Sequence, residues 1–169
     1  MQQLERIIEG ILFATDAPLN LEAIVNLFSE NERPEKKVAR AAIDNIRAHY
    51  NERGIELVEL ASGFQFQVKK DLASWVQRLW EERPQKYSHA FLETLALIAY
   101  RQPITRNEIA DIRGVVVNTL TIKTLLEREW IKVVGTKDVP GKPSLYATTK
   151  QFLDDFGLQD LNELPSLIK

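Results

Sequence analysis

The sequence predicts a mainly α-helical protein with small β-hairpins, an α+β chain made of two tandem winged-helix domains. Three helix-like apolar patterns followed by two strand-like segments occur twice along the 169 residues. Residues 102–105 also match residues 17–20, an offset of 85 positions. A helix-turn-helix with an appended hairpin is a winged helix. We therefore expect one domain over residues 1–83, a second over 84–158 and a short acidic tail over 159–169.

Three helices open the first domain. Apolar residues recur in 3–14 at the spacing of one buried helical stripe, formed by Leu4, Ile7, Ile8, Ile11 and Leu12. Asn20 can cap a second helix over 21–28. Pro34 suits the first turn of a third helix, which extends to about Tyr50.

A hairpin and an extra helix complete the first domain. Residues 55–60 and 64–68 have the composition of strands, and 61–63 form the tight turn between them. Residues 71–80 predict an additional helix with one apolar face. Residues 81–86 are polar and contain a proline, so they predict the linker.

The second domain begins with a helix that is apolar nearly all round, over residues 91–100, with Ser88 as its cap. Such a helix is buried on more than one side. A third helix of this domain is expected over 118–128.

Between these two helices the sequence contains a capping box. Thr105 and Glu108 stand three residues apart before a short helix over 107–112, which is the spacing of reciprocal capping. Gly114 follows the helix and suits the left-handed turn at its end.

A second hairpin and a last helix follow. Residues 131–134 and 144–148 predict strands. Pro140 and Gly141 suit the two central positions of a type II turn between them. A short helix is expected over 152–156.

Composition limits the function classes. The chain has no cysteine, which excludes disulfides and thiolate sites. It has no apolar run of the ~20 residues that a membrane span needs, and its start lacks the pattern of a signal peptide. We therefore expect a cytoplasmic protein that does not enter a membrane. Net charge is −2, although residues 104–150 carry eight Lys/Arg against five Asp/Glu.

Catalytic chemistry is not indicated. His49 and His89 stand far from any acidic cluster, so a metal site is not expected. There is no nucleophile elbow and no glycine-rich phosphate loop. The sequence therefore predicts a protein that is not an enzyme and has no cofactor.

Two classes of binding protein remain. A winged-helix DNA-binding transcriptional regulator would present basic and amide side chains on its third helix, where residues 118–128 offer mainly Asn118 and Lys123. Exposed apolar residues would instead indicate a protein partner or self-association. Val115–Val117, Trp75 and Trp80 are candidates for such a surface, and intradomain packing is the alternative for each.

Several motifs resemble those of the bacterial segregation and condensation protein B family. They are Ile8–Ala14 followed by Ala17–Leu19, Leu92–Val115, Leu125–Arg128, Gly135–Pro143, Tyr146–Thr149, Phe156–Leu158 and Leu164–Pro165. The match covers nearly the whole chain. Val115–Thr119 departs from it, because that family usually has a polar, serine-containing entry to the third helix.

The resemblance implies a homodimer formed mainly through the N-terminal domains. It also implies a non-enzymatic adaptor that binds the central part of the kleisin subunit and, through it, the SMC ATPase. Such a complex supports chromosome condensation and partition during the cell cycle and cell division. It would place the chain in the cytoplasm, associated with the nucleoid, with weak or indirect DNA contact.

Polar motif positions are the candidate partner-binding residues, because core packing explains them less readily. These are Arg101, Gln102, Arg113, Lys137, Pro140, Gly141 and Lys142. For Arg101 and Gln102, local hydrogen bonding is an equal alternative. For Arg113, capping of a helix end is the alternative.

Overall fold

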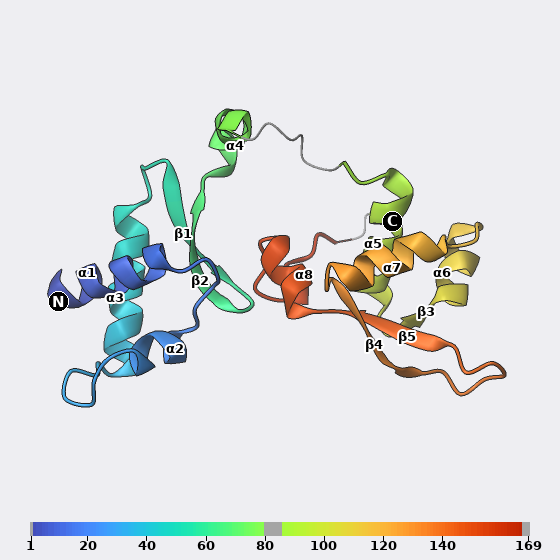
Figure 1. Cartoon of the computed structure of the whole chain (residues 1–169), viewed down its shortest axis with the longest axis horizontal. Helices are drawn as coiled ribbons and strands as arrows, with labels where there is room; N and C mark the ends of the chain where they lie inside the picture. The colour runs from blue at the N-terminus through green and yellow to red at the C-terminus, as the bar shows by residue number, and fades with distance from the viewer. Residues whose placement is uncertain (1, 80–85, 167–169) are drawn as a thin grey trace. The chain divides into compact units, whose positions relative to one another are not determined.

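The chain divides into two compact units, residues 1–83 and 84–169. The computed structural model describes residues 2–79 and 86–166 (Figure 1). Each unit has its own buried apolar core. The expected linker over 81–86 lies outside the described residues except for Lys86.

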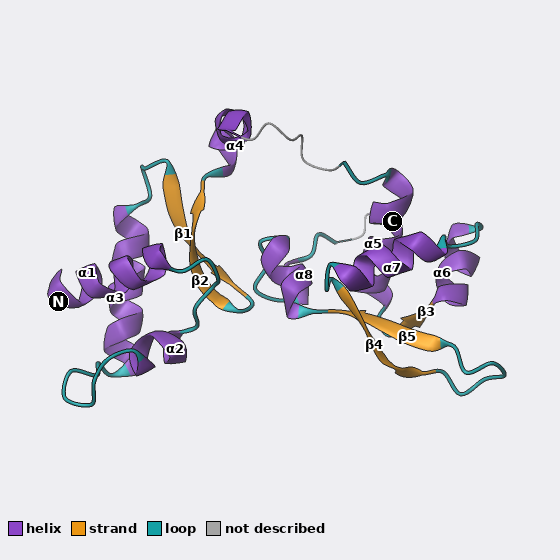
Figure 2. Ribbon diagram, in the orientation of Figure 1, coloured by secondary structure: helices purple, strands orange, loops and turns teal. Residues whose placement is uncertain are grey.

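The first unit begins with helices and continues into a two-stranded antiparallel hairpin, drawn in purple and orange in Figure 2. Its elements up to the end of the hairpin are α1 (Gln2–Ala14), α2 (Leu21–Asn26), α3 (Lys36–His49), β1 (Ile55–Leu60) and β2 (Gly63–Val68). Ile8, Leu12, Ile24, Ile43 and Phe64 are fully buried between the helices and the hairpin. The winged-helix prediction is confirmed for this unit.

The capping residues and the proline predicted the positions of the helices in this unit, except for the start of α3. The Asn20 side chain accepts a hydrogen bond from the Ala23 N–H at 2.8 Å, so the predicted cap is confirmed. α3 begins at Lys36 after the extended Glu35, so the placement of Pro34 in its first turn was wrong. Ile7 was expected in the buried stripe of α1, but it is exposed.

Gly63 is required by the close approach of two backbones. Leu19 forms an isolated antiparallel bridge with Phe64, through N–O distances of 3.0 and 2.8 Å. A Cβ at Gly63 would stand 2.2 Å from the carbonyl carbon of Leu19, and φ at Gly63 is +137°. Only glycine fits this space and this conformation.

The single helix predicted over residues 71–80 was wrong. The described part of this segment is broken into 3₁₀ turns at Lys70–Leu72 and Gln77–Leu79 around one turn of α-helix, α4 (Ala73–Val76). Trp75 and Leu79 are exposed, so in the part of the chain that the structure describes these two residues of the expected apolar face are not packed into a core. A helix this short gains too little without such packing to remain regular.

The second unit repeats the plan with an added strand. Its elements are α5 (His89–Arg101), β3 (Ile104–Thr105), α6 (Arg106–Arg113), α7 (Thr119–Glu127), β4 (Ile131–Thr136), β5 (Ser144–Thr148), α8 (Lys150–Asp155) and a 3₁₀ turn at Leu161–Glu163. The three strands are antiparallel in the order β3-β5-β4. This unit is therefore also a winged helix, and its wing is the loop between β4 and β5.

The predicted caps of this unit are confirmed. Thr105 and Glu108 form a reciprocal capping box at the start of α6, and Gly114 ends the helix with a φ of 71°. The Ser88 side chain accepts from the Phe91 N–H. In the wing, the Lys142 N–H donates to the Val139 carbonyl at 2.9 Å. Gly141 has a φ of 86°, as a type II turn requires.

The internal repeat extends to strand pairing. Ile104 pairs with Tyr146 on β5, just as Leu19 bridges to Phe64 on β2. Both residues follow the proline of the matching tetrapeptide, and both precede the residue that caps the next helix. In each unit, the residue between the proline and the helix cap therefore pairs with the second strand of the hairpin. The sequence did not predict this pairing in either unit.

The acidic tail packs onto the second unit. Leu164 contacts the second core together with Leu97 and Tyr146. The Tyr100 hydroxyl donates a hydrogen bond to the Pro165 carbonyl at 2.5 Å. Residues 159–166 therefore contribute to the packing of this unit.

Candidate functional site

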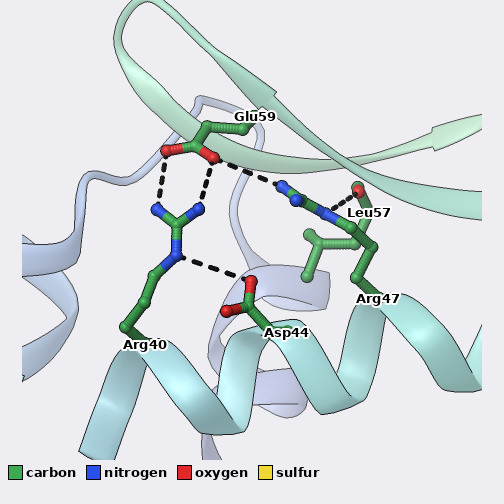
Figure 3. A network of polar contacts seen from close by, with 5 residues as sticks. All are labelled: Arg40, Asp44, Arg47, Leu57 and Glu59. Atoms are coloured by element: carbon green, nitrogen blue, oxygen red, sulfur yellow. Dashed lines mark hydrogen bonds and ion pairs between the residues drawn. The ribbon is translucent and has the colours of Figure 1, made fainter. Parts of the chain in front are cut away.

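Two arginines on the third helix of the first unit are paired with a carboxylate of the hairpin, although their side chains remain 40% and 39% exposed. Arg40 donates two hydrogen bonds of 2.8 Å to the two carboxylate oxygens of Glu59 on β1. Arg47 donates to the same carboxylate at 3.4 Å and to the Leu57 carbonyl at 3.3 Å. Figure 3 shows both guanidinium groups converging on Glu59, with Asp44 also at Arg40.

Electrostatics reinforces this arrangement. The hydrogen bond from Arg40 is the largest factor lowering the pKa of Glu59, against the opposing effect of burial. The carboxylate therefore stays ionised and paired. The Arg40 guanidinium also lies over the Phe64 ring, 5.1 Å from its centroid. Two cations of α3 are thus used to fasten the helix to its hairpin.

The third helix of the second unit, α7, also presents few cations for contact with DNA. Lys123 of α7 lies 3.7 Å from Glu127, an exposed pair on the same helix. Lys36 of α3 lies 3.7 Å from Glu22 of α2. Phosphate contacts need cations that are available to the backbone of the nucleic acid. α3 and α7 therefore present few cations, and the lysines named here share their surroundings with a carboxylate.

Gln102 is held inside the second unit. Its amide nitrogen donates to the Ala99 carbonyl at 2.9 Å and to the Thr148 hydroxyl at 3.0 Å. Its amide oxygen accepts from the Thr148 N–H at 2.8 Å. The side chain joins the end of α5 to β5, which is the local hydrogen bonding that the sequence left as an alternative.

Arg113 is also turned inward. Its side chain is 9% exposed, and its Nε lies 3.1 Å from Glu93 on α5. A second nitrogen donates to the buried Thr94 hydroxyl at 3.3 Å. Arg113 therefore ties the end of α6 to α5.

Lys137 fastens the wing to α6. Its ammonium lies 2.5 Å from the Glu108 carboxylate. That hydrogen bond, followed by those from the Thr105 backbone and hydroxyl, lowers the pKa of Glu108 from 4.5 to about 2. One carboxylate thus serves the helix cap and the wing together.

Arg101 lies at the surface next to the same carboxylate. A hollow of about 330 Å³ is lined by Arg101, Pro103, Ile104, Glu108, Asp111 and Ile112. The structure therefore brings Arg101 and Lys137 to one region around Glu108, which we call the α6–wing surface. Pro140, Gly141 and Lys142 are exposed at the tip of the wing. Gln102 and Arg113 do not join this surface.

Exposed apolar residues form a second feature of this unit. In the turn between α6 and α7, Val116 is 83% exposed and Val115 is also exposed, whereas Val117 is fully buried. Leu120 and Ile112 flank this turn and are exposed as well. The sequence singled out Val115 and Val116 correctly as exposed, whereas Val117 lies in the core, which was the alternative of intradomain packing. It missed the exposed Ile112 and Leu120.

No catalytic arrangement is found in the described residues. Within 2–79 and 86–166 no three His, Cys, Asp or Glu side chains come together to hold a metal ion. His49 and His89 are exposed on α3 and α5. None of the described helices has the length and apolarity that a membrane crossing requires.

These features define a tandem winged-helix protein with exposed apolar residues in the turn between α6 and α7 and a mixed polar and apolar hollow beside α6. A family model described as "Segregation and condensation complex subunit ScpB" matches residues 6–167. The chain belongs to this family.

Relatives agree with the family match. A segregation and condensation protein B homolog of Coxiella burnetii is 51% identical over 161 residues, covering 95% of this chain and 77% of that protein. Segregation and condensation protein B of Syntrophotalea carbinolica is 42% identical over 166 residues, covering 98% and 82%. The crystal structure of ScpB from Mycobacterium tuberculosis is 32% identical, covers 93% of this chain and 96% of that one, and superposes with a TM-score of 0.43.

Proposed function

We propose that this chain is a non-enzymatic adaptor in a complex of an SMC ATPase and a kleisin. It acts in the cytoplasm as a homodimer held together by its first unit, and it binds the central segment of the kleisin. In that role it supports chromosome condensation and segregation. The observation that carries the proposal is membership of the segregation and condensation complex family across residues 6–167.

The α6–wing surface is the proposed kleisin contact. It combines the exposed cation Arg101 with the apolar Pro103 and Ile112 around one hollow. The ion pair between Lys137 and Glu108 fixes the wing beside it. A mixed surface of this kind suits an amphipathic helix or an extended segment laid in a groove.

Calorimetric titration with the central segment of the same organism's kleisin tests the proposal. We expect saturable heat at a defined ratio per dimer, and co-elution of the two proteins in gel filtration. Absence of both, with circular dichroism showing a folded sample, would refute the adaptor function. Titration with duplex DNA at two salt concentrations is the parallel arm, since a steep salt dependence with sequence preference would identify a DNA-binding regulator.

A further inference from the structure

One strand edge of the second unit is uncovered. β4 lies at the edge of its sheet, because the strand order is β3-β5-β4 (Figure 2). The opposite edge is β3, which leads directly into α6. The outer edge of β4 therefore faces away from β3, and within the described residues no strand pairs with it. An edge of this kind presents backbone N–H and C=O groups that can pair with a further strand.

Side chains of the described residues leave β4 open as well. Only Ile131 at its start is buried, and the five residues that follow are all exposed. Neighbouring residues of a strand point to opposite faces, so both faces of β4 are largely uncovered over this stretch. Val133 is 51% exposed and Val134 47%. A Cβ built at Gly135 would meet nothing within 4 Å.

The edge strand of the first unit provides a contrast. β1 also lies at the edge of its sheet, but each of its six residues is buried or half-buried. The Leu57 carbonyl of β1 accepts a hydrogen bond from Arg47, and the Glu59 carboxylate binds Arg40 and Arg47. Cover of this kind keeps an edge from pairing with another chain. β4 has no such cover from the residues that the structure describes.

Charge indicates what kind of strand fits β4. Lys132 is the one charged residue of β4, and it is exposed. Residues 131–143, which include the wing, carry three lysines and one aspartate. If two copies of β4 paired, they would bring these lysines together, and like charges across a strand pair are destabilising. A carboxylate on a different strand would instead form a favourable cross-strand pair with Lys132.

The irregularity of β4 also disfavours pairing between identical edges. The register with β5 shifts between Val133 and Gly135, so Val134 forms a bulge. Bulges and lysines are devices by which edge strands avoid pairing with copies of themselves. Neither device excludes a different, acidic strand. The two exposed valines beside Lys132 would then pack against apolar residues of that strand.

We propose that the outer edge of β4 binds an extended, acidic segment of another protein as an added strand, with a carboxylate of that segment beside Lys132. Strand addition of this kind takes its affinity from main-chain hydrogen bonds and its specificity from alternate side chains. The site is additional to the α6–wing surface. It follows from the strand order, exposure and charge of β4 and does not depend on the adaptor function.

A pair of synthetic peptides tests the chemistry of the partner. The probe alternates glutamate with valine and is blocked at both ends, and its matched control alternates lysine with valine. In titrations of the intact chain, we expect saturable binding of the glutamate peptide and at least ~10-fold weaker binding of the lysine peptide. Equal affinities, or no binding of the glutamate peptide, would overturn the proposal.

Hydrogen exchange followed by NMR tests the strand geometry. New backbone hydrogen bonds protect amides from exchange. With the glutamate peptide at saturation, amides of β4 should exchange at least ~10-fold more slowly, whereas amides of β1 should be unaffected. Binding that leaves the exchange of β4 unchanged would show that the peptide does not add as a strand.

Substitutions locate the site on β4. Lys132→Glu should weaken binding of the glutamate peptide about tenfold and strengthen binding of the lysine peptide. Lys37→Glu, at an exposed lysine of the first unit, is the matched control and should change neither affinity. Val133→Asp should weaken binding of the glutamate peptide. If Val133→Asp does not fold by circular dichroism, Lys132→Glu and the exchange data decide, and an unchanged peptide preference in Lys132→Glu would remove the site from β4.

Discussion

Replacing Glu108 should lower the unfolding free energy of the second unit, through the loss of two interactions that can be measured separately. The carboxylate completes the capping box with Thr105 and binds Lys137 of the wing. Glu108→Gln preserves the cap, since glutamine also serves in capping boxes, but it removes the charge. Glu108→Ala removes both interactions.

The expected magnitudes follow from the pKa and the exposure. A pKa lowered from 4.5 to about 2 corresponds at most to roughly 3 kcal/mol. The side chains of Lys137 and Glu108 are 44% and 38% exposed, so solvent screening reduces the pair to about 1 kcal/mol. Losing the cap costs about 1 kcal/mol more. We therefore expect a loss of about 1 kcal/mol for Glu108→Gln and about 2 kcal/mol for Glu108→Ala.

The pH dependence has a defined sign. The folded-state pKa of Glu108 is depressed, so its contribution is fully present above pH 4.5. It is lost as the pH falls from 4.5 toward about 2. The difference in unfolding free energy between wild type and Glu108→Gln should therefore shrink across this window.

Urea unfolding followed by tryptophan fluorescence measures these values. With Trp75 and Trp80 replaced by phenylalanine, the buried Trp130 reports on the second unit alone. A double-mutant cycle with Lys137→Met isolates the ion pair. A coupling energy near zero, with wild type and Glu108→Gln losing stability in parallel below pH 4.5, would refute the reasoning.

Three further predictions concern other sites. Gly63→Ala should destabilise the first unit by about 4 kcal/mol or more, because its Cβ would overlap the backbone of Leu19; near-native stability in a thermal melt would contradict this. Glu59→Gln should cost about 1–2 kcal/mol in urea unfolding by leaving Arg40 and Arg47 without their shared anion; an unchanged midpoint would show that the network adds no stability. Arg101→Glu should leave the melting temperature unchanged and weaken kleisin binding about tenfold by calorimetry, whereas unchanged affinity would remove Arg101 from the contact.

The sequence predicted what depends on a few neighbouring residues. The Thr105–Glu108 capping box, the Asn20 cap and the Gly141 turn each require only a local backbone geometry and a suitable side chain. The order of helices and hairpins followed from periodicity for the same reason. These features account for the correct assignment of two winged helices.

The sequence did not predict the features that depend on contacts between residues far apart in the chain. The strand pairing of Ile104 depends on a segment about forty residues away, and the two-residue strand has no pattern of its own. Gln102 is turned inward because Thr148 offers it both a donor and an acceptor. Ile7 has the spacing of a core residue, and only packing shows that it lies outside. Sequence periodicity does not distinguish an apolar face that is buried in the chain from one left for a partner.

Because residues 159–166 pack onto the second unit, they determine where a fragment of this unit can end. Leu164 lies against the core, and Pro165 accepts the Tyr100 hydroxyl, although both follow the last helix by several residues. A fragment that stops at Leu158 would expose apolar surface around Leu97 and Tyr100 to water. Such a fragment should be less soluble than one that extends through Ser166, and a proteolytic nick after α8 would act as a destabilising lesion.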